Sequence, residues 1–185
     1  MVKIKFTKNA LRAEEDKLHQ FELYLPTLQL KKALLQAEVF SAYQQLQELF
    51  SQKEKAREAV DAFAVLLVEP YQNEILKFVT VEYVAKHYEN IAGVEIPIFE
   101  QVVFAKATYH LLDTPLWFDA ALIKLKKMIV LREKIFVIEE KKRALEKDLR
   151  DVSIRVNLFE KVLIPRSLAN IKKIKIFLGD QQLSA

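Results

Sequence analysis

The residue types that most often perform catalysis are present in this sequence, but none has the spacing that an active site or metal site needs. His19, His87 and His110 stand alone, without the paired spacing of a metal site. Gly93 and Gly179 are too few and too far apart for a phosphate-binding loop. No serine lies in a Gly-x-Ser-x-Gly elbow, and cysteine is absent. We therefore predict a protein that is not an enzyme, with no catalytic, cofactor-binding or metal-binding residues.

Positive charge gathers near the two ends of the chain, although the net charge is only +4. The cations concerned are Lys3, Lys5, Lys8 and Arg12 at one end, and Arg155, Lys161, Arg166, Lys172, Lys173 and Lys175 at the other. Lysines that keep a helix soluble and suit its C-terminal dipole give a similar pattern. If the two ends meet in space, however, they form a basic tip suited to an electronegative partner. Nucleic acid is disfavoured, because no aromatic residues interleave these cations for base stacking.

Two long helical segments are predicted to position these charges. The first runs from about residue 8 to residue 68, and its apolar residues step by three and four in one register, which is typical of a coiled-coil seam. This seam consists of Leu11, Leu18, Phe21, Leu25, Leu28, Leu35, Val39, Ala42, Leu46, Leu49, Ala56, Val60, Phe63 and Leu67, with polar breaks at Glu14, Lys32 and Lys53. Pro26 removes one backbone donor and is expected to kink this helix without ending it.

The second helical segment begins with a start signal, Thr114 as N-cap followed by Pro115. Its seam reads Trp117, Ala121, Met128, Leu131, Ile135, Ile138, Leu145, Leu149, Val152, Val156, Phe159 and Leu163, with polar breaks at Lys124 and Lys142. After Pro165 the pattern resumes about one residue out of register, at Leu168, Ile171, Ile174 and Leu178. This shift predicts a local bend or unwinding at Pro165, and Gly179 is expected to end the helix.

The middle of the chain has a different pattern. Residues 75–84 and 91–99 are rich in β-branched and aromatic side chains, and residues 87–90 between them form the expected turn of a β-hairpin. Pro97 is expected to confine its strand to a sheet edge or to end it. Residues 100–112 are predicted as either a short helix or a further strand.

Composition and length together favour paired helices over a globular sheet protein. The 185 residues are 51% hydrophobic and 29% charged, which excludes disorder, and they include only two glycines and five prolines for turns. Each long segment would extend about 90 Å as a helix and would need a partner for its apolar stripe. We predict a mainly α protein, a rigid antiparallel two-helix coiled-coil hairpin, divided into residues 1–68, a middle region 69–114 and residues 115–185. Neither a signal peptide nor a membrane span is expected.

Residues 155–166, RVNLFEKVLIPR, resemble the C-terminal signature of the D subunit of the V-type ATPase and ATP synthase family. Residues 7–35 are similar to the family's N-terminal helix, and residues 90–97, NIAGVEIP, match a recurrent stretch before its second helix. The likeness therefore covers nearly the whole chain in the right order. Its most specific part is the Arg-Val-Asn to Ile-Pro stretch.

This resemblance implies a central rotor stalk that transmits rotation between a ring of catalytic A and B subunits and the membrane ion-translocating ring. The chain would be cytoplasmic and peripheral to the membrane, while ATP hydrolysis would belong to the A subunits. The candidate residues that face the catalytic ring are Lys8, Arg12, Arg155, Asn157, Glu160, Pro165, Arg166, Lys172 and Lys173. The middle region would meet the F subunit and a funnel-shaped subunit above the membrane ring, with Val81, Tyr83, Val94, Ile96 and Phe99 as candidate contacts.

Two other functions fit the same helical pattern. A static tethering coiled coil would use the middle region as a docking domain but would need no defined tip. A membrane-surface helical hairpin would use its cations on anionic lipid, and such a protein would place them along one face rather than at one end.

Overall fold

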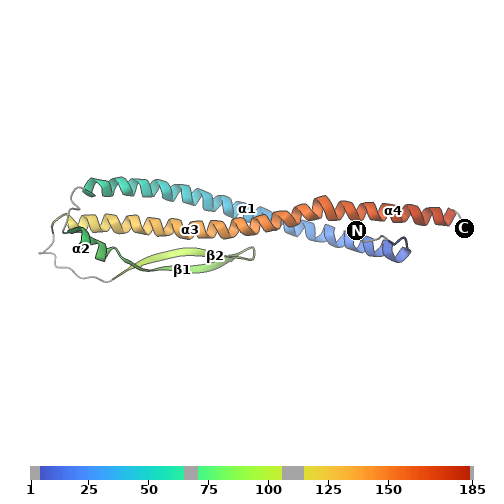
Figure 1. Ribbon diagram of the computed structural model, residues 1–185, viewed down its shortest axis with the longest axis horizontal. Helices are drawn as coiled ribbons and strands as arrows, with labels where there is room; N and C mark the ends of the chain where they lie inside the picture. Colours follow the sequence, from blue (N-terminus) through green and yellow to red (C-terminus); the bar gives the residue numbers. More distant parts are fainter. Residues whose placement is uncertain (1–4, 65–70, 106–114, 184–185) are drawn as a thin grey trace. The chain divides into compact units, whose positions relative to one another are not determined.

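The computed structural model describes residues 5–64, 71–105 and 115–183, and it confirms the predicted mainly α fold with a β-hairpin in the middle (Figure 1). The elements are α1 (Lys8–Ala64), α2 (Tyr71–Phe78), β1 (Val81–Ile91), β2 (Val94–Phe104), α3 (Phe118–Leu158), a π-helical turn η1 (Phe159–Leu163) and α4 (Ile164–Leu183). The predicted boundaries between the middle region and its flanks involve residues outside the described ranges.

The chain forms two compact units. Unit 1 comprises Met1–Gln36 and Lys147–Ala185, and unit 2 comprises Ala37–Glu146. Unit 1 therefore contains the first part of α1, the end of α3, the π turn and α4. Unit 2 contains the rest of α1, the start of α3, α2 and the β-hairpin.

Helix α1 begins where a threonine can cap it. The Thr7 side-chain oxygen accepts a hydrogen bond from the Ala10 N–H at 3.2 Å, and the Thr7 carbonyl accepts one from the Leu11 N–H at 3.0 Å. The helix continues through Pro26, as predicted, while the expected kink there stays a prediction. Every predicted seam residue of α1 within residues 8–62 is buried or half-buried, including the polar breaks Glu14 and Lys32. The last two predicted seam positions, Phe63 and Leu67, lie outside the residues whose side chains are described.

The junction of α3 and α4 explains the register shift that the sequence shows near Pro165. The Ile164 N–H bonds to the Phe159 carbonyl, five residues earlier, and this bond closes a π-helical turn. The buried residues Val156 and Ile171 are fifteen residues apart, one more than two heptads. The wider turn accommodates the extra residue, so the apolar residues of α4 return to the seam. The predicted local unwinding is thus confirmed as a π turn.

Two details of the predicted second seam are corrected. Leu168 is 50% exposed, and the seam position belongs to Ser167, which is 5% exposed beside the buried Ile171 and Ile174. Gly179 does not end the helix, because α4 continues to Leu183. Gly179 also lacks the positive φ of a helix C-cap, so the conformational freedom of glycine is not needed at this position.

Helix α3 starts later than predicted. The Phe118 N–H donates to the Pro115 carbonyl at 2.9 Å, which makes residues 115–117 a turn leading into a helix that begins at Phe118. The predicted cap Thr114 lies outside the described residues. Phe118 is fully buried with Ile75 and Ala121, and Phe78 packs its ring edge-on against it at 5.9 Å. We attribute the later start to this packing, which anchors the first helical residue in the core of unit 2.

The hairpin is confirmed, but its boundaries differ from those predicted. Residues 75–78, predicted as the start of a strand, belong instead to helix α2, because Ile75 and Phe78 pack from this helix against the core around Phe118. The strands pair antiparallel with Ile91 opposite Val94, so the turn is Ala92–Gly93 and not residues 87–90. Both turn residues have positive φ, 53° and 83°, as a two-residue type I′ turn requires.

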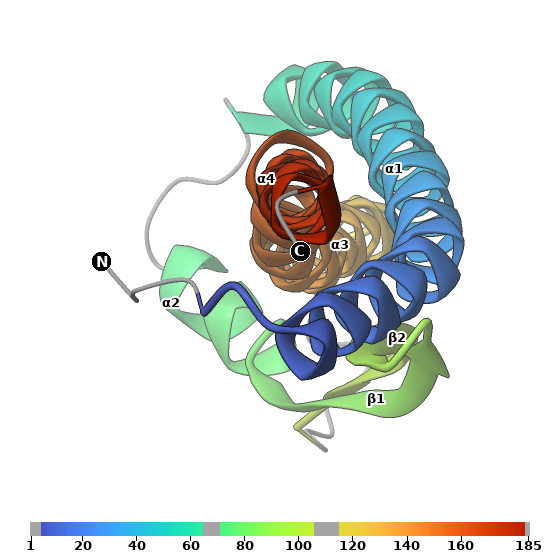
Figure 2. The same cartoon turned by 90° about the vertical axis from the view of Figure 1, so that its right-hand side faces the viewer.

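The resulting ribbon is twisted (Figure 2). Its pairing register shifts at two places, between Val81 and Tyr83 and between Ala85 and Lys86. Pro97 lies within β2 opposite Tyr88 and does not end the strand, which is an edge strand of this two-stranded sheet. Of residues 100–112, residues 100–104 belong to β2 and residues 106–112 lie outside the described ranges. Among the described residues, no helix is long and apolar enough to cross a membrane.

Candidate interaction sites at the helical tip and the hairpin

Unit 1 brings the two ends of the described chain together. The rings of Phe6 and Phe177 pack in a tilted arrangement with their centres 4.9 Å apart, and the Lys175 ammonium pairs with the Glu15 carboxylate at 2.8 Å. The Asn170 amide donates to the Glu14 carboxylate at 3.3 Å. These contacts join the first turns of α1 to α4. The antiparallel pairing therefore gives the helical tip that the sequence predicts, defined here as residues 5–17 and 155–177.

All nine candidate residues at the tip are exposed: Lys8, Arg12, Arg155, Asn157, Glu160, Pro165, Arg166, Lys172 and Lys173. They do not lie together in one small cluster. Arg155 and Lys173 are eighteen residues apart along α3, η1 and α4, which corresponds to about 27 Å of helix. The tip thus offers an extended strip of charge that would fit a large protein surface better than a small anion.

The π turn is held from the side of α1. The Gln29 amide donates to the Glu160 carboxylate at 2.5 Å, and the Phe21 ring packs edge-on against Phe159 with centres 5.4 Å apart. The sequence pointed to Glu160 only through its place in the family motif. Its position in the wider turn brings its carboxylate within reach of Gln29, so this candidate tip residue also links the π turn to α1.

Glu14 is a tip residue whose role the sequence pattern did not reveal, since it reads only as a polar break in a seam. Its carboxylate accepts hydrogen bonds from Lys17 at 2.9 Å and from Asn170 at 3.3 Å. The hydrogen bond from Lys17 is the main cause that lowers the pKa of Glu14; the Asn170 bond and the nearby charge of Arg166 also lower it, against partial burial. Glu14 is thus a charged link between α1 and α4.

In unit 2, the hairpin lies along α3 (Figure 1). The Lys86 ammonium pairs with the Glu140 carboxylate at 2.8 Å, and this hydrogen bond is the main cause that raises the pKa of Lys86. The ammonium groups of Lys134 and Lys126 lie 5.3 Å and 5.2 Å from the ring centres of Phe99 and Phe104. Lysine side chains of α3 and β1 therefore contribute to the contact between ribbon and helix.

The five candidate residues of the middle region differ in accessibility. Val94 and Ile96 are 8% and 0% exposed, so both are packed inside unit 2. Val81 and Phe99 are half-buried, and Phe99 lines a groove of about 530 Å³ between α1, β2 and α3. Tyr83 is 55% exposed. Tyr83 is therefore the member of this set whose ring is most open to a partner.

Within residues 5–64, 71–105 and 115–183, no group of three or more His, Asp or Glu side chains is arranged to hold a metal ion. Many titratable groups of the tip and hairpin are instead used in ion pairs and hydrogen bonds between elements.

Comparison with known proteins gives matches over almost the whole chain. The family model for the D subunit of ATP synthase matches residues 10–185. The V-type ATP synthase D subunit of Chlamydia caviae is 47% identical over 182 residues, covering 98% of this chain and 88% of the relative. The protein of the same name from Chlamydia trachomatis serovar L2 is also 47% identical, covering 98% and 90%, and that from Chlamydia pneumoniae is 44% identical, covering 99% and 88%.

Proposed function

Since the chain belongs to the family of ATP synthase D subunits, we propose that it is the central-stalk rotor subunit of a V-type ATPase or ATP synthase. In this role it transmits rotation between the ring of catalytic A and B subunits and the ion-translocating ring in the membrane. It performs no catalysis itself, and it works at the cytoplasmic side as a peripheral part of the membrane-bound complex. The observation that supports this best is the nearly full-length match to the family.

The packing of unit 1 suits a part that carries torque. A rotor must resist sliding and twisting of one helix against the other. The contacts Glu14–Asn170, Glu15–Lys175 and Lys31–Asp148 link α1 to its partner helices at separate levels. Each link is weak alone, but sliding the helices by one turn would break all of them together.

We assign the binding of the catalytic A and B subunits to the exposed charged residues of the tip. Its cations Arg155, Arg166, Lys172 and Lys173 would meet electronegative surfaces of successive subunits as the rotor turns. Unequal contacts with successive subunits would then favour different nucleotide states.

The middle region would bind the F subunit and the funnel-shaped subunit above the membrane ring. There Tyr83 and Phe99 would contact the partner, because Tyr83 is exposed and Phe99 lines an open groove. Val94 and Ile96 would keep the hairpin folded, because both are buried.

The assignment is tested by assembling A and B subunits with this chain and measuring ATP hydrolysis. The substitutions Arg155→Glu and Arg166→Glu reverse charge at two exposed positions of the tip. Lys127→Glu is the matched control, because Lys127 is exposed on α3 in unit 2. Lys141 is less suitable, since its side chain is 12% exposed and pairs with Glu38.

We expect the tip variants to weaken binding to the A and B ring by about tenfold or more, because a charge reversal replaces attraction with repulsion at the interface. Lys127→Glu should assemble like the unmodified chain. Equal effects of all three substitutions would contradict a specific tip. Failure of the unmodified chain to associate with A and B subunits would contradict the rotor role itself.

A further inference from the structure

The face of α1 that points away from its partner helix is apolar along part of unit 1. Leu23, Leu30 and Leu34 are 64%, 62% and 50% exposed. Thr27, also exposed, lies between the first two, so the four residues follow steps of four, three and four. Each comes two residues after a position of the seam, which is about 200° further round the helix. These four residues, which we call the α1 stripe, therefore line the side of α1 opposite the seam.

The α1 stripe lies in a stretch of helix with almost no exposed charge. Within residues 18–36 of α1, all of which the structure describes, Glu22 is the one exposed charged side chain, since Lys31 and Lys32 are half-buried. The outer face of a helix pair in water ordinarily carries charged and polar residues, and a helix that is apolar on opposite faces is ordinarily covered on both. The α1 stripe therefore has the composition of a contact surface and not of a solvated one.

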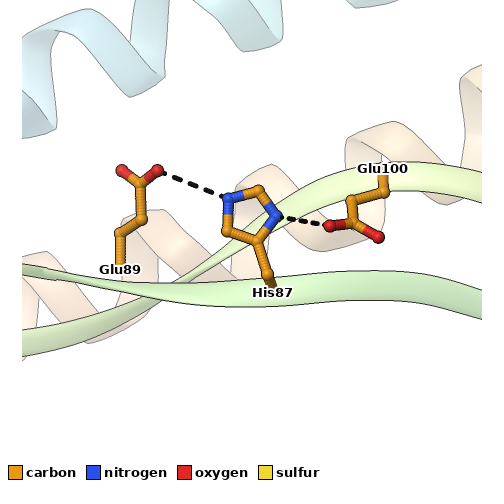
Figure 3. A network of polar contacts seen from close by, with 3 residues as sticks. All are labelled: His87, Glu89 and Glu100. Atoms are coloured by element: carbon orange, nitrogen blue, oxygen red, sulfur yellow. Dashed lines mark hydrogen bonds and ion pairs between the residues drawn. The ribbon is translucent and has the colours of Figure 1, made fainter.

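Two exposed surfaces of unit 2 show the usual solvated pattern. On β1, the exposed imidazole of His87 lies between two carboxylates, 2.9 Å from Glu100 of β2 and 3.3 Å from Glu89 (Figure 3). The last turns of α1 expose the charged side chains of Glu54, Lys55, Arg57, Glu58 and Asp61. The lack of charge along the α1 stripe is thus not a general property of this chain or of this helix.

The α1 stripe shares its level in unit 1 with a residue already assigned to the catalytic ring. The contact between the rings of Phe21 and Phe159, 5.4 Å apart, and the ion pair between Lys31 and Asp148, at 3.4 Å, bracket this level. The partner stretch between them contains the exposed Arg155. A ring of subunits that encloses unit 1 at Arg155 would therefore also meet the stripe on the other side.

The other side of this level is charged. Ile154 and Leu158 of α3 are 60% and 44% exposed there. They are interspersed with the exposed charged side chains of Arg150, Asp151, Arg155 and Lys161. Unit 1 thus presents an uncharged face on α1 and a charged face on α3 and the π turn.

We propose that the α1 stripe is a second contact surface for the A and B subunits, one that meets uncharged, apolar side chains of the ring. This inference rests on the proposed rotor function and names the chemistry of one side of that contact. Anionic lipid and nucleic acid would require cations, and the stripe has none. Apolar contact is non-directional, so it stays favourable as successive subunits pass the stripe, whereas the charged side favours particular positions.

The first test measures the binding of variants of the full chain to assembled A and B subunits. Leu30→Gln and Leu34→Gln make the stripe polar without adding charge, and both should fold, because these side chains are exposed and glutamine is a good helix former. Losing the burial of one leucine should weaken binding by about fivefold or more. Ile123→Gln is the matched control, since Ile123 is 69% exposed on α3 in unit 2 and should leave this binding unchanged.

The salt dependence of binding separates the two faces of unit 1. Raising the ionic strength from about 0.05 M to about 0.5 M screens exposed charges, so the loss of affinity caused by Arg166→Glu should shrink. The loss caused by Leu30→Gln should remain, because the burial of apolar surface does not depend on charge. A loss for Leu30→Gln that disappeared at high salt would contradict an apolar contact.

Because the chain contains no cysteine, a single introduced thiol probes burial directly. Leu30→Cys places this thiol on the stripe, and Ile123→Cys places it outside the stripe. Both thiols should react with a maleimide in the free chain, because both positions are exposed. In the complex with A and B subunits, the Leu30→Cys thiol should lose most of its reactivity, while the Ile123→Cys thiol should keep it.

The possible outcomes distinguish the stripe contact from the rotor function. If the unmodified chain did not bind A and B subunits, both would be wrong. If it bound them but the variants at Leu30 behaved like those at Ile123, only the stripe contact would be overturned. Sedimentation of the chain alone tests a second copy as the occupant: a dimer that Leu30→Gln dissociates, with unchanged binding to the ring, would overturn the proposal in favour of self-association.

Discussion

Units 1 and 2 use the same pair of antiparallel helices but stabilise them differently. In unit 1 the seam faces only the other helix. It buries Leu35 and Ile174 fully, but residues near the start of α1 such as Leu11 and Leu18 remain half-buried. In unit 2 the hairpin and α2 add a further layer, and Phe118 and Ile96 become fully buried. A two-helix hairpin cannot bury a wide apolar stripe, because each helix covers only one side of its partner.

Unit 1 compensates with polar and aromatic contacts between the helices. Glu14–Asn170, Glu15–Lys175, Gln29–Glu160 and Lys31–Asp148 fix the pairing in discrete steps. Exposed ion pairs contribute only about 0–1 kcal/mol each, so they specify the register more than they add stability. We therefore expect the packing of unit 2 to contribute more of the free energy of unfolding. The contacts of unit 1 should contribute more to the register of the two helices.

The largest expected effect tests this difference with one substitution type in both units. Phe118→Ala empties a fully buried site in unit 2 and should lower the free energy of unfolding by about 3–5 kcal/mol. Phe21→Ala removes a half-buried ring in unit 1 that packs edge-on against Phe159, and it should cost about 1.5–2.5 kcal/mol. Chemical denaturation of both variants measures the two values. Equal losses would show that the thinner packing of unit 1 carries as much stability as the core around Phe118.

The two helix prolines give the next largest effect, although both lie in unit 1. Pro26 sits inside the continuous α1, where proline removes a backbone hydrogen bond and crowds the preceding turn. Pro26→Ala should therefore stabilise the chain by about 1–3 kcal/mol, reduced by the greater freedom of alanine in the unfolded state. Pro165 follows a π turn that already redirects the hydrogen bonds, so Pro165→Ala should change stability by less than about 1 kcal/mol in chemical denaturation.

The outcome for Pro165→Ala also decides what causes the π turn. The fifteen-residue separation of Val156 and Ile171 remains in the variant, so we expect the π turn to remain as well. Its hydrogen-bond pattern is visible in amide exchange and in a structure of the variant. A regular α-helix through residues 159–163 would show that the proline, and not the apolar spacing, produces the wider turn.

The sequence was sufficient for those features that depend on repeated local patterns. The step of three and four predicts the seams of both helices, and the one-residue shift after Leu163 predicts a disturbance that the π turn accounts for. It also predicts the tip, because antiparallel pairing must bring the chain ends together. The same pattern favoured Leu168 in place of Ser167, since it ranks positions by hydrophobicity, whereas a small side chain suits close packing of two helices.

Features that depend on tertiary packing were not predictable in this way. Ile75 to Val84 has the composition of a strand, but contact with Phe118 makes its first part helical. The sequence predicts the hairpin turn at residues 87–90 instead of Ala92–Gly93, because Ala92 is an unusual residue for positive φ and gives no turn signal. The links at Glu14 and His87 involve partners distant in sequence or across a bulge, so single positions did not reveal them.

The smallest expected effect is the pH dependence of stability, which should differ between the two units. Hydrogen bonding from Lys17 lowers the pKa of Glu14 below its ordinary value of 4.5, so the folded state favours the ionised form. The resulting stability is present above about pH 4.5 and is lost as the pH falls through the folded pKa. In unit 2, the hydrogen bond to Glu140 raises the pKa of Lys86 above its ordinary 10.5. That contribution is present below about pH 10.5 and is lost as the pH rises through the folded pKa.

Differences between the unmodified chain and single variants isolate these two contributions from the other titrating groups. The stability difference between the chain and Glu14→Gln should shrink between about pH 5 and pH 3, while Glu22→Gln, at an exposed position of α1, serves as control. The difference for Lys86→Gln should shrink between about pH 10 and pH 12, with the exposed Lys77→Gln as control. Both changes should be modest, because these side chains retain access to water. If the acid-sensitive link were instead in unit 2, the free energy of unfolding of Glu14→Gln would equal that of the unmodified chain at every pH. Polar contacts would then no longer distinguish the tip from unit 2.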